Sequence, residues 1–132
     1  YFAEHFRFLE ETYGRRPEKL IDLNLAIIRY LIAVLRLDTE VVRLCDLGVE
    51  GRGTELLLRI CKASGASEFL LQRAAMKYLD TDRFEQAAVS LRPFSPPSPV
   101  YPQLWGDFIP NLSTFDMLFN CGPKARDILL DF

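Results

Sequence analysis

The fold is decided by residues 67–94, which read SEFLLQRAAMKYLDTDRFEQAAVSLRPF. Residues 67–71 and 89–94 are short, largely apolar segments with the composition of strands, and residues 78–87 between them have the composition of a helix. A helix between two strands carries the chain back across the sheet, so the strands pair in parallel. This stretch therefore predicts a strand–helix–strand unit.

The sequence upstream extends this unit. Residues 39–45, TEVVRLC, are apolar and β-branched and predict another buried strand, and a helix is expected from about Thr54 to Gly65. Residues 38–94 therefore predict a βαβαβ arrangement. The expected fold class is α/β, with a small parallel three-stranded sheet, flanking helices and a helix-rich composition overall.

The two ends of the chain are predicted to be helical. Apolar residues at helical spacing in residues 1–37 predict a helical hairpin, whose first helix has an aromatic face. The second helix is apolar around most of its circumference and needs cover on nearly all sides. Residues 95–132 predict a stiff proline-rich connection, an irregular loop and two short helices, with Ser113 and Asp116 forming a capping box. We expect residues 1–132 to form a single α/β domain.

Composition excludes several classes of protein. The net charge is −2, and no basic patch of the kind that general nucleic-acid binding requires is visible. The longest apolar segment, residues 20–37, contains charged residues and is not expected to span a membrane. Three widely separated cysteines predict buried free thiols in a reducing compartment. The sequence indicates no metal site and no cofactor, and it leaves the catalytic residues unknown. The lone histidine, His5, is expected on the polar or boundary side of its helix.

The first candidate site follows the predicted strand 39–45. Asp46 lies at the end of this strand, and Gly51, Arg52 and Thr54 lead into the N-terminus of a helix. Backbone N–H groups in such a turn can approach an anion, and an arginine can clamp a phosphate or a carboxylate. The loop has neither the dinucleotide-binding nor the P-loop glycine pattern. The alternative is a flexible loop in which Thr54 only caps the helix.

The second candidate site is the loop around Trp105. Tyr101, Gln103 and Trp105 combine aromatic faces with hydrogen-bonding groups, a composition that is used to hold sugars and nucleobases. The alternative is that Trp105 and Phe108 anchor a long loop to the core. If the loop around Trp105 is a binding site, we expect both candidate sites to converge on a shared hollow at one rim of the sheet, where ligands of parallel sheets bind.

Several segments resemble the WbqC-like proteins, a bacterial family associated with surface-polysaccharide gene clusters. The resemblance rests on Tyr1-Phe2, Asp22-Leu23-Asn24, residues 46–51 with 54–57, residues 60–62 and, most specifically, the tail from Tyr101-Pro102-Gln103-Leu104 to Phe119-Asn120-Cys121-Gly122-Pro123. Family members usually carry an upstream His-Gln-Pro type motif, which this chain lacks. They also carry a Ser-Gly-Pro turn and an Arg-Asp pair where residues 71–77 here read LQRAAMK, a change that weakens a site at the end of the second strand. We therefore expect the chain, which begins at Tyr1, to be the C-terminal part of a longer WbqC-like protein.

The resemblance implies a cytoplasmic protein of bacterial surface-polysaccharide (O-antigen) biosynthesis that transfers an acyl, aminoacyl or glycosyl-type group to a nucleotide-linked sugar. In this hypothesis Asp46, Arg52 and the 51–54 turn bind the phosphate side, while the aromatic loop holds the sugar or the acceptor. The rival hypothesis is a non-catalytic interaction or assembly module. It would be a degenerate family member whose apolar helix faces bind another subunit or a second copy of the chain.

Overall fold

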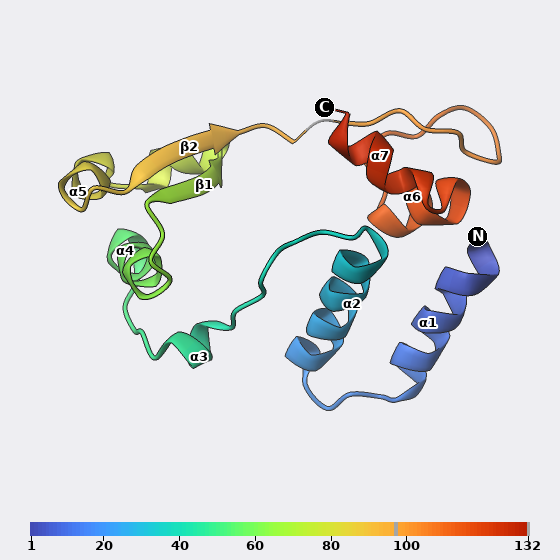
Figure 1. Cartoon of the computed structure of the whole chain (residues 1–132), viewed down its shortest axis with the longest axis horizontal. Coiled ribbons are helices and arrows are strands. Elements are labelled where there is room, and N and C mark those ends of the chain that lie inside the picture. The colour runs from blue at the N-terminus through green and yellow to red at the C-terminus, as the bar shows by residue number, and fades with distance from the viewer. Residues whose placement is uncertain (97, 132) are drawn as a thin grey trace. The chain divides into compact units, whose positions relative to one another are not determined.

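The chain forms two compact units in a computed structural model that describes residues 1–96 and 98–131. Unit 1 comprises residues 1–40 and the described tail from residue 98, and unit 2 comprises residues 41–96 (Figure 1). Each unit contains its own cluster of buried apolar side chains. A single domain over the whole chain stays a prediction.

Unit 2 is built around two parallel strands. β1 (Glu68–Gln72) pairs with β2 (Ser90–Phe94) along its whole length. The 3-10 helix η1 (Arg73–Tyr78) and the helix α5 (Thr81–Gln86) connect the two strands, so the predicted strand–helix–strand unit is confirmed. α4 (Gly53–Ala63) precedes β1 in the chain. The structure is therefore α/β and rich in helices, as expected.

The core of unit 2 lies between the sheet and its helices. Phe84 of α5 is fully buried, and its ring lies 5.6 Å from the ring of Phe69 in β1, centroid to centroid. Cys61 of α4 and Val89, which precedes β2, belong to the same buried cluster. The apolar positions of α4 and α5 therefore attach both helices to the sheet.

The predicted first strand, residues 39–45, is wrong. Residues 39–43 belong to no helix or strand, and the short helix α3 (Leu44–Leu47) follows them. β-branched side chains favour an extended backbone, but no described strand pairs with this segment. Arg43 and Asp46 instead close a helical turn, because the Nε and Nη2 atoms of Arg43 donate to the Asp46 carboxylate at 2.8 and 2.7 Å. The described part of the chain thus contains a two-stranded sheet rather than a three-stranded one.

Unit 1 is helical. α1 (Phe2–Gly14) and α2 (Leu20–Val34) form the predicted hairpin and lie side by side (Figure 1). α6 (Thr114–Cys121) and α7 (Lys124–Leu130) are the two short helices predicted for the tail. In the part of the chain that the structure describes, no helix is both long and apolar enough to cross a membrane.

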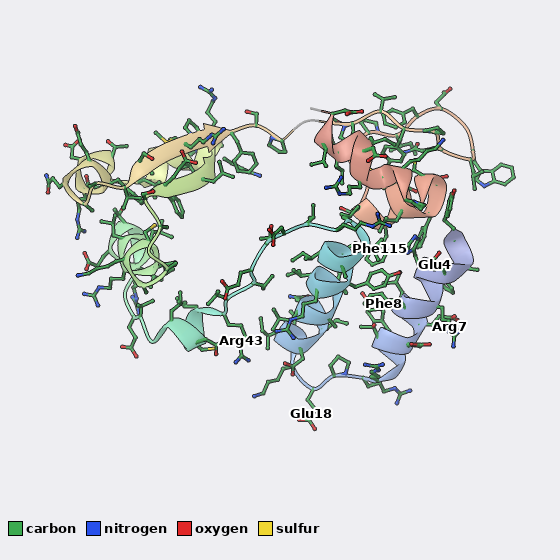
Figure 2. The ribbon with its side chains drawn as sticks, in the orientation of Figure 1. Glu4, Arg7, Phe8, Glu18, Arg43 and Phe115 are labelled. Carbon is green, nitrogen blue, oxygen red and sulfur yellow. The ribbon has the colours of Figure 1, made fainter. Side chains whose placement is uncertain are left out.

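α1 packs mainly through residues outside the aromatic face that its sequence predicts, but Phe2 of that face contacts Phe119 of α6 edge-on at 4.9 Å between ring centroids. Three residues of that predicted face are exposed: Phe2, Phe6 and Tyr13. His5 and Thr12 are buried instead, which corrects the expected boundary position of His5. Phe8 stacks on Tyr30 of α2 at 3.7 Å between ring centroids, and it faces Phe115 of α6 (Figure 2). His5 is tolerated inside because its Nδ1 lies 2.7 Å from the Tyr30 hydroxyl, so its polar group is paired.

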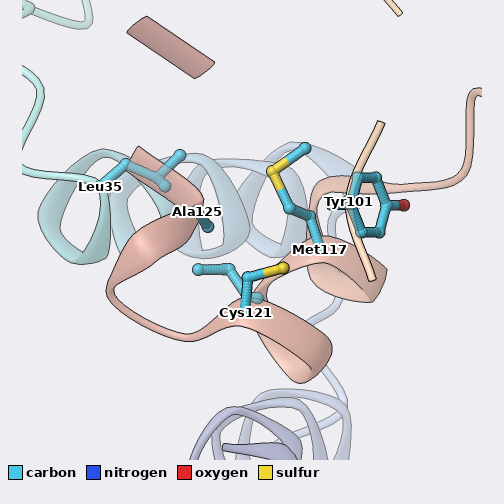
Figure 3. Packing of buried hydrophobic residues seen from close by; sticks show 6 residues of the cluster. Leu35, Tyr101, Met117, Cys121 and Ala125 are labelled. Atoms are coloured by element: carbon cyan, nitrogen blue, oxygen red, sulfur yellow. The ribbon is translucent and has the colours of Figure 1, made fainter. Parts of the chain in front are cut away.

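The core of unit 1 joins the end of α2 to the two tail helices. Figure 3 shows this cluster, in which a tyrosine from the loop before α6 packs among aliphatic and sulfur-containing side chains. Its buried members are Leu35, Tyr101, Met117, Leu118, Cys121 and Ala125. The loop is therefore attached to the core through Tyr101.

Candidate functional site

The turn before α4 contains most of the first candidate site. Gly51 and Gly53 have φ angles of 145° and 54°, values that favour glycine, so the chain can bend sharply on both sides of Arg52. Arg52 is the N-cap residue of α4, and its side chain makes no capping hydrogen bond. Arg52 is exposed and pairs with none of the described residues. The turn thus leaves an uncommitted guanidinium at the N-terminal end of α4.

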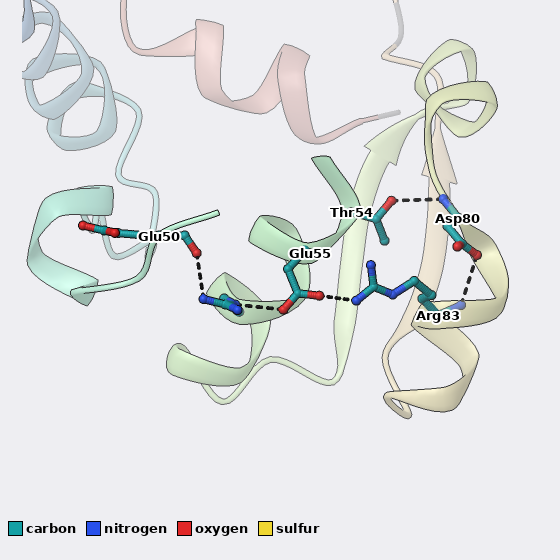
Figure 4. Close-up of polar contacts among 6 residues, drawn as sticks. Glu50, Thr54, Glu55, Asp80 and Arg83 are labelled. Atoms are coloured by element: carbon teal, nitrogen blue, oxygen red, sulfur yellow. Dashed lines mark hydrogen bonds and ion pairs between the residues drawn. The ribbon is translucent and has the colours of Figure 1, made fainter. Parts of the chain in front are cut away.

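Thr54 connects this turn to α5. Its hydroxyl accepts a hydrogen bond from the backbone N–H of Asp80 at 3.0 Å (Figure 4). Asp80 in turn caps α5, because its Oδ1 accepts from the N–H of Arg83 at 3.4 Å. The alternative prediction that Thr54 caps α4 is wrong, since Arg52 occupies the cap position.

Glu55, in the first turn of α4, bridges two arginines. Its carboxylate accepts from Arg59 at 2.8 Å and also forms an ion pair with Arg83 (Figure 4). Arg59 additionally donates to the carbonyl of Glu50 at 3.1 Å, which ties the loop before the turn to α4. Hydrogen bonds from Arg59 and then Arg83 lower the pKa of Glu55. The negative charge of Glu55 is therefore already offset by two cations.

Asp46 lies in α3 rather than at the end of a strand. Its exposed carboxylate is held by the bidentate contact with Arg43, which lowers the pKa of Asp46. The thiol of Cys45 also donates to Asp46 Oδ1 at 3.6 Å. Asp46 is predicted as a site residue because of its position at the end of a strand, and that position is wrong. Its carboxylate instead bonds to Arg43, the N-cap residue of α3.

Two of the three cysteines are buried as predicted. Cys61 and Cys121 are free thiols in the two cores, and burial raises the pKa of both. Cys45 is also free but exposed, so the prediction of burial is wrong there. Within residues 1–96 and 98–131, no group of three or more His, Cys, Asp or Glu side chains is placed to hold a metal ion.

The loop at residues 98–113 is held together by its own predicted ligand-binding residues. Tyr101 is only 6% exposed, and its hydroxyl donates to Asp116 Oδ2 at 2.8 Å. Gln103 donates to Asp116 at 3.3 Å and to the carbonyl of Ile109 at 3.0 Å, and it accepts from the N–H of Ile109 at 2.9 Å. The Asp116 carboxylate is thus engaged with the loop, and Ser113 makes no side-chain cap, so the predicted capping box is wrong.

Trp105 differs from its neighbours in the loop. It is 86% exposed and borders a hollow of about 330 Å³ that includes Leu104 and Phe119. Phe108 packs edge-on against Tyr101, with ring centroids 5.7 Å apart. Of the two aromatic residues predicted as alternative anchors, Phe108 fits that description and Trp105 does not.

The predicted site residues are divided between the units. Asp46 and the 51–54 turn belong to unit 2, and residues 101–105 belong to unit 1. Their convergence on a shared hollow stays a prediction.

The carboxyl ends of β1 and β2 border a hollow of about 490 Å³, at the strand end where the sequence predicts a weakened site. Its lining includes Gln72, Arg73, Phe94 and Ser95. Arg73 could have been found only from its position directly after a strand of a parallel sheet, where ligands commonly bind. The altered 71–77 stretch therefore still borders a concave surface.

Comparison with known proteins assigns the chain to a family. A model of the WbqC-like protein family matches residues 1–128. The chain belongs to this family. It is 29% identical over 131 residues to the uncharacterized protein Rv1507c of Mycobacterium tuberculosis, a match that covers 98% of this chain and 57% of that protein. The WbqC-like chain thus spans little more than half the length of this relative, and no solved structure matches it.

Proposed function

We propose that this chain is part of a cytoplasmic WbqC-like transferase of surface-polysaccharide biosynthesis, and that it binds a nucleotide-linked sugar. The observation that supports the proposal is the turn before α4. Arg52 is exposed and unpaired with respect to the described residues, while Thr54, Glu55 and Arg59 hold the surrounding backbone. A fixed turn with an uncommitted guanidinium is suited to binding a phosphate.

Each part of the turn has a role in this proposal. The first N–H groups of α4 would donate to a phosphate oxygen, and the partial positive charge of the helix end favours an anion there. Arg52 would add a bidentate, charge-assisted contact. Glu55 does not oppose the anion strongly, because Arg59 and Arg83 offset its charge. The transferred group, of acyl, aminoacyl or glycosyl type, would then be attached to the bound sugar.

The aromatic loop would contribute to the sugar or acceptor side. Trp105 presents an exposed ring on which a sugar can stack. Tyr101 and Gln103 would act mainly by holding the loop in shape, since their polar groups already bond to Asp116 and Ile109.

Thermal unfolding tests the proposal. A panel of nucleotide-diphosphate sugars is added to the chain, and at least one is expected to raise its melting temperature, since a ligand that binds only the folded state stabilises it. Arg52→Ala is expected to abolish this rise. Arg92→Ala is the matched control, because Arg92 is also exposed and its single ion pair within the described residues is with Glu68 at 3.3 Å. A panel without any stabilising member, or a rise that survives in Arg52→Ala, contradicts the proposal.

The second candidate function is an interaction or assembly module. Its supporting observation is the apolar surface of α2, where Leu20 is 71% exposed and Ile21 and Ile28 are exposed two turns apart on one face. A second copy of the chain is the partner to test first. Light scattering over a range of concentrations is expected to show a dimer, and Ile21→Glu with Ile28→Glu is expected to return it to a monomer. A monomer at every concentration contradicts this function.

A further inference from the structure

A charged hollow lies within unit 1, and its lining includes none of the residues predicted to contact a ligand. Its volume is about 720 Å³. It is bordered by the first turn of α1, the end of α2 and the start of α7. The charged and titratable residues that line it are Glu4, His5, Arg36, Lys124, Arg126 and Asp127. Glu4 is labelled at the beginning of α1 in Figure 2.

The cations of this hollow are not paired. Among the described residues, none of Arg36, Lys124 and Arg126 takes part in an ion pair or a side-chain hydrogen bond. The Nε atom of Arg126 is buried and has no hydrogen-bond partner there. A buried guanidinium N–H without an acceptor is unfavourable, and native structures usually satisfy such a group with a protein atom, water or a ligand. The buried Nε atom of Arg126 is thus a donor without an acceptor among the described residues.

The backbone of Arg36 allows a matched test of its side chain. Arg36 directly follows the C-cap of α2 and has a φ of 51°, in the left-handed region where glycine is the usual residue. Arg16 has a similar backbone directly after the C-cap of α1 and does not line the hollow, so this conformation alone does not indicate a function. The side chain of Arg36 lines the hollow.

The charges in the hollow indicate the kind of ligand. Three cations (Arg36, Lys124 and Arg126) and two carboxylates (Glu4 and Asp127) leave one positive charge when His5 is neutral. The Nδ1 atom of His5 is already engaged with the Tyr30 hydroxyl at 2.7 Å. A small excess of positive charge suits one oxyanion group better than a polyanion such as nucleic acid. We propose that this hollow binds the phosphate or carboxylate group of a small ligand, with Arg126 and Arg36 as the main donors.

The test uses inorganic phosphate and acetate as probes. Each is titrated into the chain at constant ionic strength, with chloride as the balancing anion, and binding is followed by calorimetry. Saturable binding of at least one probe is expected, and Arg126→Gln and Arg36→Gly should each weaken it by about tenfold or more, the usual effect of losing one charge-assisted hydrogen bond. Binding of phosphate alone would identify a phosphate ligand, and binding of acetate alone a carboxylate ligand.

Arg36→Gly separates binding from folding. It removes the guanidinium and also relieves the left-handed strain, so the melting temperature should stay the same or rise while affinity falls. Arg16→Gly is the matched control, because Arg16 also has a left-handed backbone, with φ of 48°, and does not line the hollow. It should be equally well folded and bind the probe like the unmodified chain.

Several results would overturn the proposal. These are the absence of binding of both probes, unchanged affinity in both Arg36→Gly and Arg126→Gln, or an equal loss in Arg16→Gly. Phosphate can also bind at the proposed nucleotide-sugar site, so the binding assigned to the hollow is the binding that Arg52→Ala retains. A complete loss of probe binding in Arg52→Ala would place the anion at the turn before α4 and contradict the inference.

Discussion

The turn at residues 51–54 and the loop at residues 98–113 are both predicted from the sequence to bind a ligand, but they differ in what their polar side chains contact. In the loop, Tyr101 and Gln103 bond to Asp116 and to the loop backbone. In the turn, the neighbouring residues supply most of the bonds, and Arg52 is left without a described partner. Polar loop residues can therefore hold either the loop or a ligand. The difference is set by whether an acceptor such as Asp116 lies nearby in the fold.

The largest expected effect separates two aromatic residues of the loop. Tyr101→Ala removes a ring that is 6% exposed and leaves the Asp116 carboxylate short of a donor. The free energy of unfolding should fall by about 3–5 kcal/mol, as for other buried aromatic residues. Trp105→Ala should change it by less than about 0.5 kcal/mol, because Trp105 is 86% exposed. Denaturant unfolding measures both, and equal losses would show that the loop is not held by Tyr101.

A smaller effect is expected at Gln103. Gln103→Ala removes the amide that donates to the Ile109 carbonyl and accepts from the Ile109 N–H, at 3.0 and 2.9 Å. The expected cost is about 1–2 kcal/mol, the net value of two ordinary hydrogen bonds, because Ile109 is exposed and water can replace the lost partners. Hydrogen exchange at the Ile109 amide should accelerate. Unchanged exchange there would mean that Gln103 does not hold the loop.

The corresponding change in the turn is at Thr54. Thr54→Val keeps the shape of the side chain but removes the hydroxyl that accepts from the Asp80 N–H at 3.0 Å. The expected loss of stability is about 1 kcal/mol, the net value of an ordinary hydrogen bond. Thr54→Ser keeps the hydroxyl and is the control for urea denaturation. If Thr54→Val is as stable as Thr54→Ser, the link between α4 and α5 does not contribute.

The smallest expected effect is a loss of folding stability at acidic pH. Arg59 and Arg83 lower the pKa of Glu55 below its ordinary value of 4.5, so the unfolded chain binds this proton more readily than the folded chain. The stabilising contribution of Glu55 is therefore complete above pH 4.5 and is lost as the pH falls through the lower pKa of the folded state. Glu55→Gln should flatten this part of the acid-unfolding curve. A carboxyl resonance of Glu55 that titrates at or above the ordinary value would refute the prediction.

The sequence predicts the local parts of the fold well. α5 and the strands on both sides of it follow from short-range composition, and Asp80 caps α5 close to the predicted start of that helix. The segment 39–45 could not be assigned in the same way. Its β-branched residues indicate extended backbone, but a strand needs a partner, and that partner is determined by distant parts of the chain.

The candidate sites, like the fold, could be predicted from the sequence only where their structure depends on local residues. The glycines around Arg52 correctly indicate a turn, because their backbone preference is local. The contacts of Tyr101 and Gln103 depend on Asp116, which sequence spacing assigns to a helix cap instead. The hollow that contains Arg36 and Arg126 combines three helices that are distant in the sequence, so no local pattern could reveal it.

The most direct test of the account is a titration of the isotope-labelled chain with the nucleotide-diphosphate sugar that stabilises it best, followed residue by residue by NMR. The account predicts saturable shifts of the backbone amides at residues 51–55, which disappear in Arg52→Ala, with little change at Gln103 and Ile109. Shifts concentrated at Gln103 and Ile109, with none at residues 51–55, would contradict it.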